Sequence, residues 1–191
     1  MGGKVVFLLS GNIHKFREAR LALKEYGLST ALLRRKTFEI QSDSIEEVAL
    51  VSALYSAKKV RLPVLVEDAG LFIEGLSGFP GVYSSYVLRT IGNEGVLKLM
   101  EGLKDRRATF RSAVVFCDEN MKPKIFNGEV RGVILEEKRG TEGFGFDPIF
   151  APEEGEGRSF AEMSIEEKSE LSHRGKAFRA FGEWYTSTYK V

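Results

Sequence analysis

Strand-like and helix-like segments alternate in the first third of this chain, and no other feature of the sequence restricts the fold as much. Five consecutive apolar residues within 4–10 predict a buried strand, and apolar residues at helical spacing follow it up to Gly27. A second strand is expected within 30–33, a second helix over 44–60 and a third strand over 64–66. Alternation of this kind is typical of parallel strands connected by helices.

The second half of the sequence predicts strands that pair directly with each other. Residues 109–117 and 124–135 have strand character, and turn-forming residues cluster between them. Helices are expected within 94–103 and over 164–185, and the latter begins with a serine followed three residues later by a glutamate, a capping-box pattern. We therefore expect an α/β protein with a mixed sheet rather than a fully parallel one.

The charge and cysteine content exclude several classes of function. Lys and Arg total 28 and Asp and Glu total 27, so the net charge of +1 provides no general attraction to a nucleic-acid polymer or to a membrane. An anionic ligand would need a local basic pocket. The single cysteine, Cys117, cannot form an internal disulfide or a thiolate metal cluster. Residues 1–10 lack the pattern of a signal peptide, so a cytoplasmic location is expected.

Two adjacent acids, Glu67 and Asp68, follow the apolar run 64–66. Neighbouring carboxylates at the end of a buried strand repel each other and are costly to remove from water. A hard divalent cation would remove that cost, and Glu39 is a further candidate oxygen ligand. With only two histidines and one cysteine in the chain, Mg²⁺ or Mn²⁺ is favoured over Zn²⁺. A salt bridge to Lys or Arg and a solvated turn are the alternatives.

The segment LSGNIHK, residues 9–15, predicts a turn from a strand into a helix. Asn12 can cap that helix, whose first N–H groups have no partner within the helix and attract anions. Lys15 in the first turn opposes the helix dipole, so a bound anion explains it better than helix stability does. The alternative is an ordinary capped helix with a surface lysine.

Two later segments could bind a base. In TEGFGFDPIF, residues 141–150, an aromatic side chain could stack on a base and the aspartate could accept a base N–H, although a pair of core aromatics beside a turn is an equal alternative. In EEKSELSHRGKA, residues 166–177, Lys168 and Ser172 would share one helix face, and the following His and Arg could complete a basic, hydrogen-bonding cluster. The alternative there is a solvated helix face.

Each motif alone is weak, but their common order is specific. The motifs are Ser10-x-Asn12-x-x-Lys15, Glu67-Asp68-x-Gly70-Leu71, Gly78-x-Pro80-Gly81-x-Tyr83-Ser84, Phe144-Gly145-Phe146-Asp147-Pro148-Ile149-Phe150, and Glu167-Lys168-x-x-x-Ser172-His173-Arg174-Gly175. In this order, over residues 5–184, the chain resembles the inosine/xanthosine triphosphate pyrophosphatases.

The resemblance implies a fold, a reaction and a set of roles. The fold would be a single domain over 1–191, with an elongated mixed β-sheet, flanking helices and two lobes around an active-site cleft. The reaction would convert ITP, dITP or XTP to the monophosphate and pyrophosphate with Mg²⁺, and the protein would be a homodimer. Residues with an implied role in substrate binding are Ser10, Asn12, Lys15, Phe144, Phe146, Asp147, Lys168, His173 and Arg174. Those with an implied role at the metal are Glu39, Glu67 and Asp68, of which Asp68 would also be the catalytic base.

The chain also departs from the family pattern. Many members carry a phosphate-contacting lysine near the position of Ser52, and a Ser or Thr where this chain has Ala69. These departures affect the expected phosphate contacts rather than the reaction. Two other functions stay open from the sequence: a regulatory module that binds nucleoside triphosphates without cleaving them, and a pyrophosphatase for modified pyrimidine nucleotides.

Overall fold

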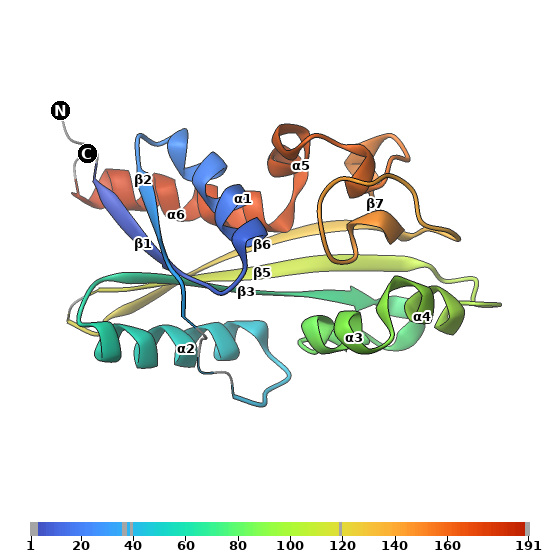
Figure 1. The fold of residues 1–191 in the computed structure, drawn as a ribbon, viewed down its shortest axis with the longest axis horizontal. Coiled ribbons are helices and arrows are strands. Elements are labelled where there is room, and N and C mark those ends of the chain that lie inside the picture. The colour runs from blue at the N-terminus through green and yellow to red at the C-terminus, as the bar shows by residue number, and fades with distance from the viewer. Residues whose placement is uncertain (1–3, 36–37, 39, 119, 190–191) are drawn as a thin grey trace.

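The chain folds around one mixed β-sheet (Figure 1), seen in a computed structural model that describes residues 4–35, 38, 40–118 and 120–189. The strand order is β2-β1-β3-β5-β6-β7, and β4 pairs with β3 beside this path. The strands are β1 (Val5–Leu9), β2 (Ser29–Leu33), β3 (Val64–Ile73), β4 (Pro80–Gly81), β5 (Arg107–Cys117), β6 (Pro123–Ile134) and β7 (Phe150–Pro152). β1 pairs in parallel with β2 and β3, and the remaining pairs are antiparallel, so the prediction of a mixed sheet is confirmed.

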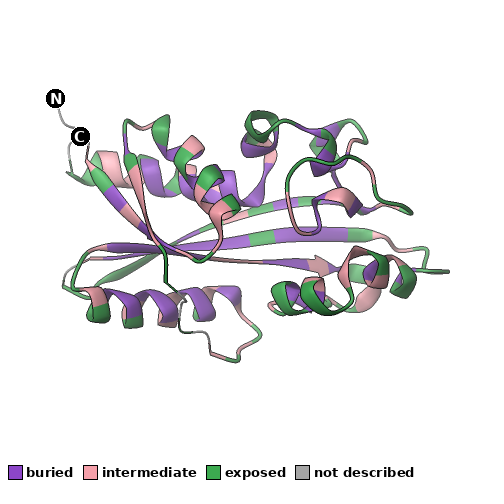
Figure 2. Ribbon diagram, in the orientation of Figure 1, coloured by how far each residue is buried: buried purple, intermediate pink, exposed green. Residues whose placement is uncertain are grey.

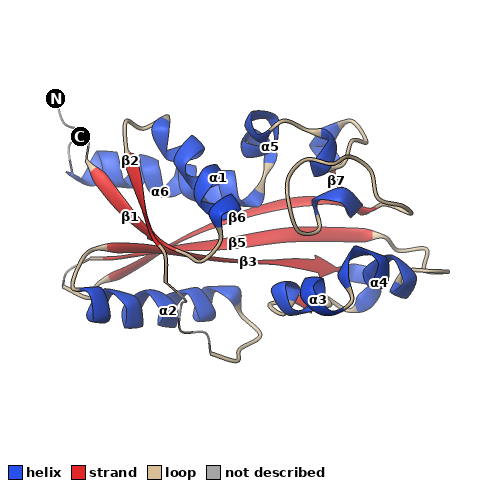
Figure 3. Cartoon of the chain, in the orientation of Figure 1, coloured by secondary structure: helices blue, strands red, loops and turns tan. Residues whose placement is uncertain are grey.

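Helices cover both faces of the sheet (Figure 3). The α-helices are α1 (Ile13–Lys24), α2 (Ile45–Val60), α3 (Ser84–Thr90), α4 (Gly92–Leu99), α5 (Ile165–Leu171) and α6 (His173–Tyr189). The 3₁₀ helices are η1 (Glu74–Leu76), η2 (Asp147–Ile149), η3 (Glu153–Gly155) and η4 (Phe160–Glu162). In Figure 1, α1, α5 and α6 lie on one side of the sheet and α2, α3 and α4 on the other.

Three apolar clusters form the core. One lies between the sheet and α1 and α6, and includes Leu65 and Phe178. A second lies between the sheet and α2, whose purple, buried side faces the strands in Figure 2. The third fills the other end of the molecule around Phe110 and Phe150, whose rings meet edge to face at 4.7 Å. The core is therefore divided between two ends of one long sheet.

The strand predicted over 64–66 is longer than expected, because β5 pairs with β3 from Val64 to Ile73. The prediction that the acidic pair ends a strand is therefore wrong: Glu67 and Asp68 lie in the middle of β3. The register pairs Glu67 with Val114 and Asp68 with Ala113, and the continuous hydrogen-bonded ladder carries the strand past the two carboxylates.

The final helix is broken at Ser172, where the sequence predicted one continuous helix over 164–185. Ser172 ends α5 with an extended backbone (φ −70°, ψ 151°), and its hydroxyl accepts a hydrogen bond from the Gly175 N–H in α6. The expected capping box of Ser164 and Glu167 is present at the start of α5. Because the helix breaks, Lys168 and Ser172 do not share one helix face.

No helix among the described residues is long and apolar enough to cross a membrane.

Candidate active site

A gap along one edge of β3 creates the site. On that edge, β1 pairs with β3 at Leu65, and β4 pairs with it at Leu71 and Phe72. The stretch between these pairings, residues 66–70, carries the acidic pair. A cleft of about 700 Å³ opens there, lined by this part of β3, the start of α1, parts of α2 and α3, and the loop that precedes η2. The local gap in strand pairing leaves room for a ligand beside the two carboxylates.

The segment 9–15 lies at one side of the cleft. The Ser10 hydroxyl accepts from the Asn12 N–H at 3.0 Å, and Asn12 Oδ1 accepts from the N–H groups of His14 and Lys15 at 2.8 and 3.4 Å. Asn12 therefore caps α1, as the sequence predicted. Lys15 Nζ lies 2.9 Å from Glu67 Oε2 and 4.0 Å from Asp68 Oδ1, so the lysine of the first helical turn is held by the acidic pair.

Glu67 is buried and bound by two cations. Besides Lys15, its carboxylate accepts from Arg174 Nε at 3.0 Å and from the Ser112 hydroxyl at 2.8 Å. Burial alone would raise the pKa of Glu67, but Arg174 and Lys15 outweigh it and lower that pKa to about 2. The carboxylate is thus anionic at neutral pH. Its contacts are those of the salt-bridge alternative, and its part in metal binding stays a prediction.

Glu18 is a buried acid at the site that the sequence analysis did not identify. It lies on the buried side of α1, and its carboxylate accepts from Lys168 Nζ at 2.6 Å and from Arg174 Nη1 at 2.8 Å. Burial would raise the pKa of Glu18, but Arg174 and Lys168 lower it. An available signal was its position: it stands next to Ala19 and four residues before Ala22, on the face that packs inward.

Carboxylate and cationic side chains alternate in one connected network. Arg174 bridges Glu18 and Glu67, and Lys168 bridges Glu18 and Asp147, whose Oδ2 lies 2.6 Å from the lysine nitrogen. The members in spatial order are Asp147, Lys168, Glu18, Arg174, Glu67 and Lys15. Charges buried at this depth are costly unless each is paired, and here each has at least one partner of opposite sign. The network connects the loop before η2 to the acidic pair on β3.

The loop before η2 presents Phe144 and buries Phe146. The Phe144 N–H donates to Asp147 Oδ2 at 2.7 Å, and burial raises the pKa of Asp147 while Lys168 opposes the rise. Phe146 belongs to the core cluster around Phe110, which matches the core alternative for that ring, and it also lines the cleft. Phe144 lies outside that cluster and lines the cleft as well.

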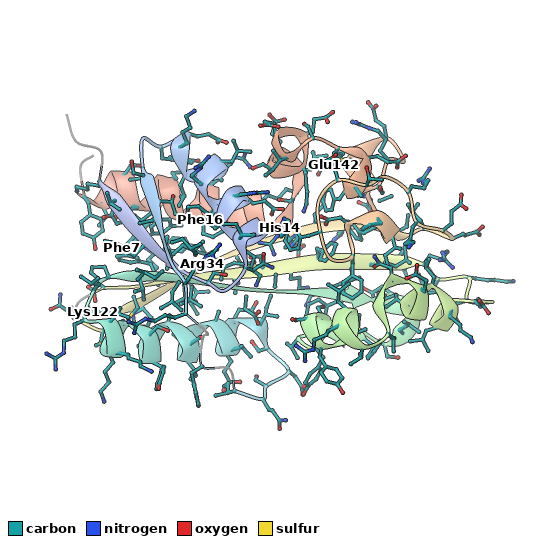
Figure 4. The ribbon with its side chains drawn as sticks, viewed as in Figure 1. Phe7, His14, Phe16, Arg34, Lys122 and Glu142 are labelled. Atoms are coloured by element: carbon teal, nitrogen blue, oxygen red, sulfur yellow. The ribbon has the colours of Figure 1, made fainter. Side chains whose placement is uncertain are left out.

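The ring of Phe144 is surrounded by nitrogen-bearing side chains. Lys168 Nζ lies 4.6 Å from its centroid and the Arg174 guanidinium carbon 5.3 Å. The imidazole of His14 stacks on it, with centroids 5.0 Å apart and planes inclined by 24°. Figure 4 shows His14 at the start of α1, on the side toward the loop that carries Glu142. His14 is exposed, and its ring also supports Phe144.

His173 is buried in the wall of the cleft. Its ring lies parallel to that of Phe110, with centroids 4.6 Å apart and planes inclined by 7°. Burial, reinforced by Arg174 and other cations, lowers the pKa of His173 well below 6.5, so the imidazole is neutral at pH 7. Among the described residues, no group forms a hydrogen bond with its Nδ1. A neutral imidazole with one uncommitted nitrogen can still pair with a ligand in the cleft.

The oxygen donors at the cleft suit Mg²⁺ or Mn²⁺. Asp68 lies at the open edge of β3 with its side chain 26% exposed, next to the anionic Glu67. Within the described part of the chain, no group of three or more His, Cys, Asp or Glu side chains could hold a metal, and Glu39 lies outside the described residues. Mg²⁺ commonly uses one or two carboxylates together with waters and substrate phosphates, so two carboxylates are compatible with it.

Ser52, at the position where many members of the resembled family carry a lysine, also lines the cleft. Its hydroxyl is buried and has no hydrogen-bond partner among the described residues. No lysine takes its place on α2, since Lys58 and Lys59 do not line the cleft. The cleft therefore lacks a cation from α2.

Comparisons with known proteins find relatives over nearly the whole chain. Residues 6–184 match the Ham1 family. A dITP/XTP pyrophosphatase of Methanopyrus kandleri is 53% identical over 182 residues, covering 95% of this chain and 96% of that protein. A dITP/XTP pyrophosphatase of Pyrococcus horikoshii is 51% identical over 179 residues, covering 94% and 95%. The solved structure of a HAM1 protein from Coxiella burnetii has a TM-score of 0.84 at 31% identity, covering 96% of this chain and 99% of that chain.

Proposed function

Because this chain belongs to the Ham1 family, we propose that it hydrolyses non-standard purine nucleoside triphosphates (dITP, ITP and XTP) to the monophosphate and pyrophosphate. The observation that carries the proposal is the acidic pair of β3, which lies in one cleft between the capped start of α1 and the aromatic loop before η2. The capped start of α1 is suited to a polyphosphate and the aromatic loop to a base. The phosphoanhydride bond to be broken would therefore lie over the carboxylates.

At the phosphate end, the chain supplies backbone and side-chain donors. Ser10, Asn12 and Lys15 surround the start of α1, whose N–H groups and dipole favour an anion. Lys15 is held by Glu67 and Asp68, and we propose that it shifts its contacts toward the phosphates when substrate binds. A lysine that exchanges one anionic partner for another keeps its charge compensated throughout.

Asp68 is the proposed base. Its carboxylate is partly exposed in the cleft and can accept a proton from the water that attacks the α-phosphorus. Asp68, Glu67 and Glu39 would hold Mg²⁺, which when bound neutralises charge on the phosphate oxygens and on the leaving pyrophosphate. The Glu67 carboxylate, fixed by Arg174 and Ser112, holds this part of β3 in one position.

At the base end, the proposal assigns stacking to Phe144 and hydrogen bonding with the purine carbonyl to His173 and Arg174. Phe146 and Asp147 line the pocket, and Lys168 lies beside Phe144. Arg174 is a donor only, and neutral His173 can donate from one ring nitrogen. Hypoxanthine and xanthine present a carbonyl where adenine has an amino group, so these donors would be left unpaired by adenine. Sites built on such hydrogen bonds can reject the wrong partner by a factor on the order of 10⁴.

The experiment is a panel of nucleoside triphosphates with Mg²⁺, in which pyrophosphate and orthophosphate are measured separately. We expect dITP, ITP and XTP to release pyrophosphate and ATP to be a very poor substrate. Hydrolysis in ¹⁸O-water should place the label in the monophosphate. Label in the pyrophosphate, or orthophosphate as the first product, would contradict attack at the α-phosphorus.

The same panel tests the two other functions. Tight binding without turnover would favour a regulatory binding module, and turnover of modified pyrimidine triphosphates in preference to purine ones would favour the third function. The acidic pair argues against a module that binds the nucleotide without Mg²⁺, because a protein that only holds a polyanion gains nothing from carboxylates beside it unless a metal is bound there.

The protein is also proposed to act as a homodimer in the cytoplasm. The family resemblance supports the dimer, and exposed apolar side chains on and next to α4, such as Ile91 (43%) and Leu99 (48%), could be covered by a second copy. The location follows from the substrate, since an enzyme of the nucleotide pool acts where nucleotides are made. A sedimentation experiment that finds only monomer at micromolar concentration would overturn the dimer.

A further inference from the structure

The cationic side chains that line the cleft differ in whether a carboxylate already pairs with them. Of the described residues that line the cleft, three are lysine or arginine: Lys15, Arg89 and Arg174. Lys15 lies 2.9 Å from Glu67, and Arg174 is bound by both Glu67 and Glu18. Both of these charges are therefore compensated before any ligand arrives.

Arg89 differs from the other two cations. It stands in the last turn of α3, on the opposite side of the sheet from α1, and its side chain is exposed. Within the described part of the chain, no carboxylate lies within 4.0 Å of its guanidinium group. The ring of Tyr86 lies beside it, with its centroid 5.7 Å from the guanidinium carbon. Tyr86 also lines the cleft, so this contact between the guanidinium group and the ring lies at the cleft wall.

The helix that carries Arg89, together with the following helix α4, contacts the base end of the site. Leu88 of α3 lies beside Gly145, where a Cβ atom would come 3.8 Å from its side chain. Asn93 of α4 donates from Nδ2 to the Gly145 carbonyl at 3.1 Å. Gly145 lies between Phe144 and Phe146 in the loop before η2. Arg89 therefore has a fixed anchor on α3, while its long side chain can reach over the cleft.

We propose that Arg89 is a binding residue for the triphosphate, which it contacts from the α3 side while Lys15 contacts it from the α1 side. The inference rests on the proposed function and adds a residue to it. A nucleoside triphosphate carries several negative charges, and the compensated cations of the α1 side would leave part of that charge exposed. A guanidinium group matches phosphate oxygens with two parallel hydrogen bonds. Ser52 and Ala69 also line the cleft, and neither side chain carries a positive charge.

The test separates phosphate contact from base contact with two simple probes. Inhibition of dITP hydrolysis is measured with inorganic tripolyphosphate, which has no base, and with inosine, which has no phosphate. The variants are Arg89→Ala, Arg89→Lys and the control Arg131→Ala. Arg131 is an arginine of β6 whose side chain is 72% exposed and does not line the cleft.

We expect Arg89→Ala to weaken inhibition by tripolyphosphate about tenfold, as for a charged hydrogen bond partly open to solvent. Inhibition by inosine should be unchanged, Arg89→Lys should recover part of the loss, and Arg131→Ala should behave as wild type. Equal tripolyphosphate inhibition of wild type and Arg89→Ala would overturn the proposal. So would an equal loss of inosine and tripolyphosphate inhibition, because Arg89 would then support the fold or the base pocket. If the wild-type protein releases no pyrophosphate from dITP, the proposed function itself fails, and direct binding of tripolyphosphate to the same variants still decides the role of Arg89.

Discussion

Arg174 illustrates how single residues hold this site. It is bound on one side by Glu67, beside the proposed base, and on the other by Glu18, which also holds Lys168. One guanidinium group therefore connects residues proposed to recognise the base with the strand proposed to carry out the chemistry. At this depth, removing any member leaves an uncompensated buried charge, so residues distant from the phosphates are expected to affect the whole site.

Replacing Glu18 by Ala should strongly destabilise the protein, because it leaves Lys168 and Arg174 short of a buried counter-charge. We expect the free energy of unfolding to fall by about 3–5 kcal/mol. The control is Glu25→Ala at the end of the same helix, which breaks a partly exposed pair with Arg179 and should cost about 1 kcal/mol or less. Urea denaturation of both variants measures the difference. Equal losses would mean that the buried network contributes no more than a surface pair.

Replacing Asp68 by Asn should abolish pyrophosphate release while the fold is retained, since the amide cannot accept a proton from water. Circular dichroism and the thermal midpoint check the fold, and steady-state turnover of dITP with saturating Mg²⁺ checks the activity. Removal of a general base typically lowers the rate by about 10²- to 10⁴-fold. Asp68 would therefore be excluded as the base if the variant kept more than about a tenth of wild-type turnover.

His173 should make stability depend on pH below neutrality. Its pKa is lowered well below 6.5 in the folded protein, so below pH 6.5 the unfolded chain takes up a proton that the folded chain does not. The free energy of unfolding should therefore decrease as the pH falls from 6.5 to 5, by at most about 1.4 kcal/mol per pH unit. Above pH 6.5 both states are neutral at this site and the effect disappears.

The variant His173→Asn isolates this effect. Asp147, whose pKa is raised, acts in the opposite direction, but it is present in both proteins and cancels in the comparison. Denaturation curves at pH 7, 6 and 5 should show a smaller slope with pH in the variant. Identical slopes would mean that the imidazole takes up its proton in the folded state as readily as in the unfolded state.

At the scale of elements, two interruptions create the site. The gap between the partners of β3 leaves residues 66–70 beside the cleft, and the break at Ser172 starts α6 at His173. The start of α6 then lies close to β6 at Gly128, where a Cβ atom would come within 2.1 Å of the His173 carbonyl oxygen and 2.6 Å of the Ala177 nitrogen. Only a residue without a side chain permits this contact.

Replacing Gly128 by Ala should push the start of α6 away from the sheet and displace His173 and Arg174 together. Both contacted atoms belong to the backbone and cannot rotate away, so we expect a loss of about 1–3 kcal/mol in stability together with a large loss of activity. The matched control is Asn127→Ala, the exposed neighbour on β6, which should be close to neutral. Wild-type activity in Gly128→Ala would show that α6 can shift without cost.

At the scale of the whole molecule, one ligand would contact elements on both sides of the sheet. The cleft is lined by α1 and the loop before η2, and also by α2 and α3 on the other face. The core is also divided, with separate apolar clusters at the two ends of the sheet. Binding in the cleft should therefore link parts of the molecule that share few apolar contacts of their own.

A dITP analogue that cannot be hydrolysed should, with Mg²⁺, slow amide hydrogen exchange in three separate segments at once. These are 10–15, 66–70 and 84–89, because all of them line the same cleft. Residues 153–156, which do not line it, are the internal reference. Protection of 10–15 and 66–70 without 84–89 would mean that substrate binds without engaging α3.

The sequence by itself determined the alternation of strands and helices in the first third of the chain, the mixed sheet and the family. Apolar spacing, capping residues and motif order are local properties, so they could be recognised without coordinates, as at Asn12 and in the pairing of β5 with β6. Only the tertiary structure decided that β3 continues through Glu67 and Asp68, because its length is set by the ladder with β5. It also decided that Glu18 joins Arg174 and that Arg89 faces the cleft from α3. These last features depend on contacts between residues far apart in the chain, and the spacing of residues along a sequence carries no direct information about such contacts.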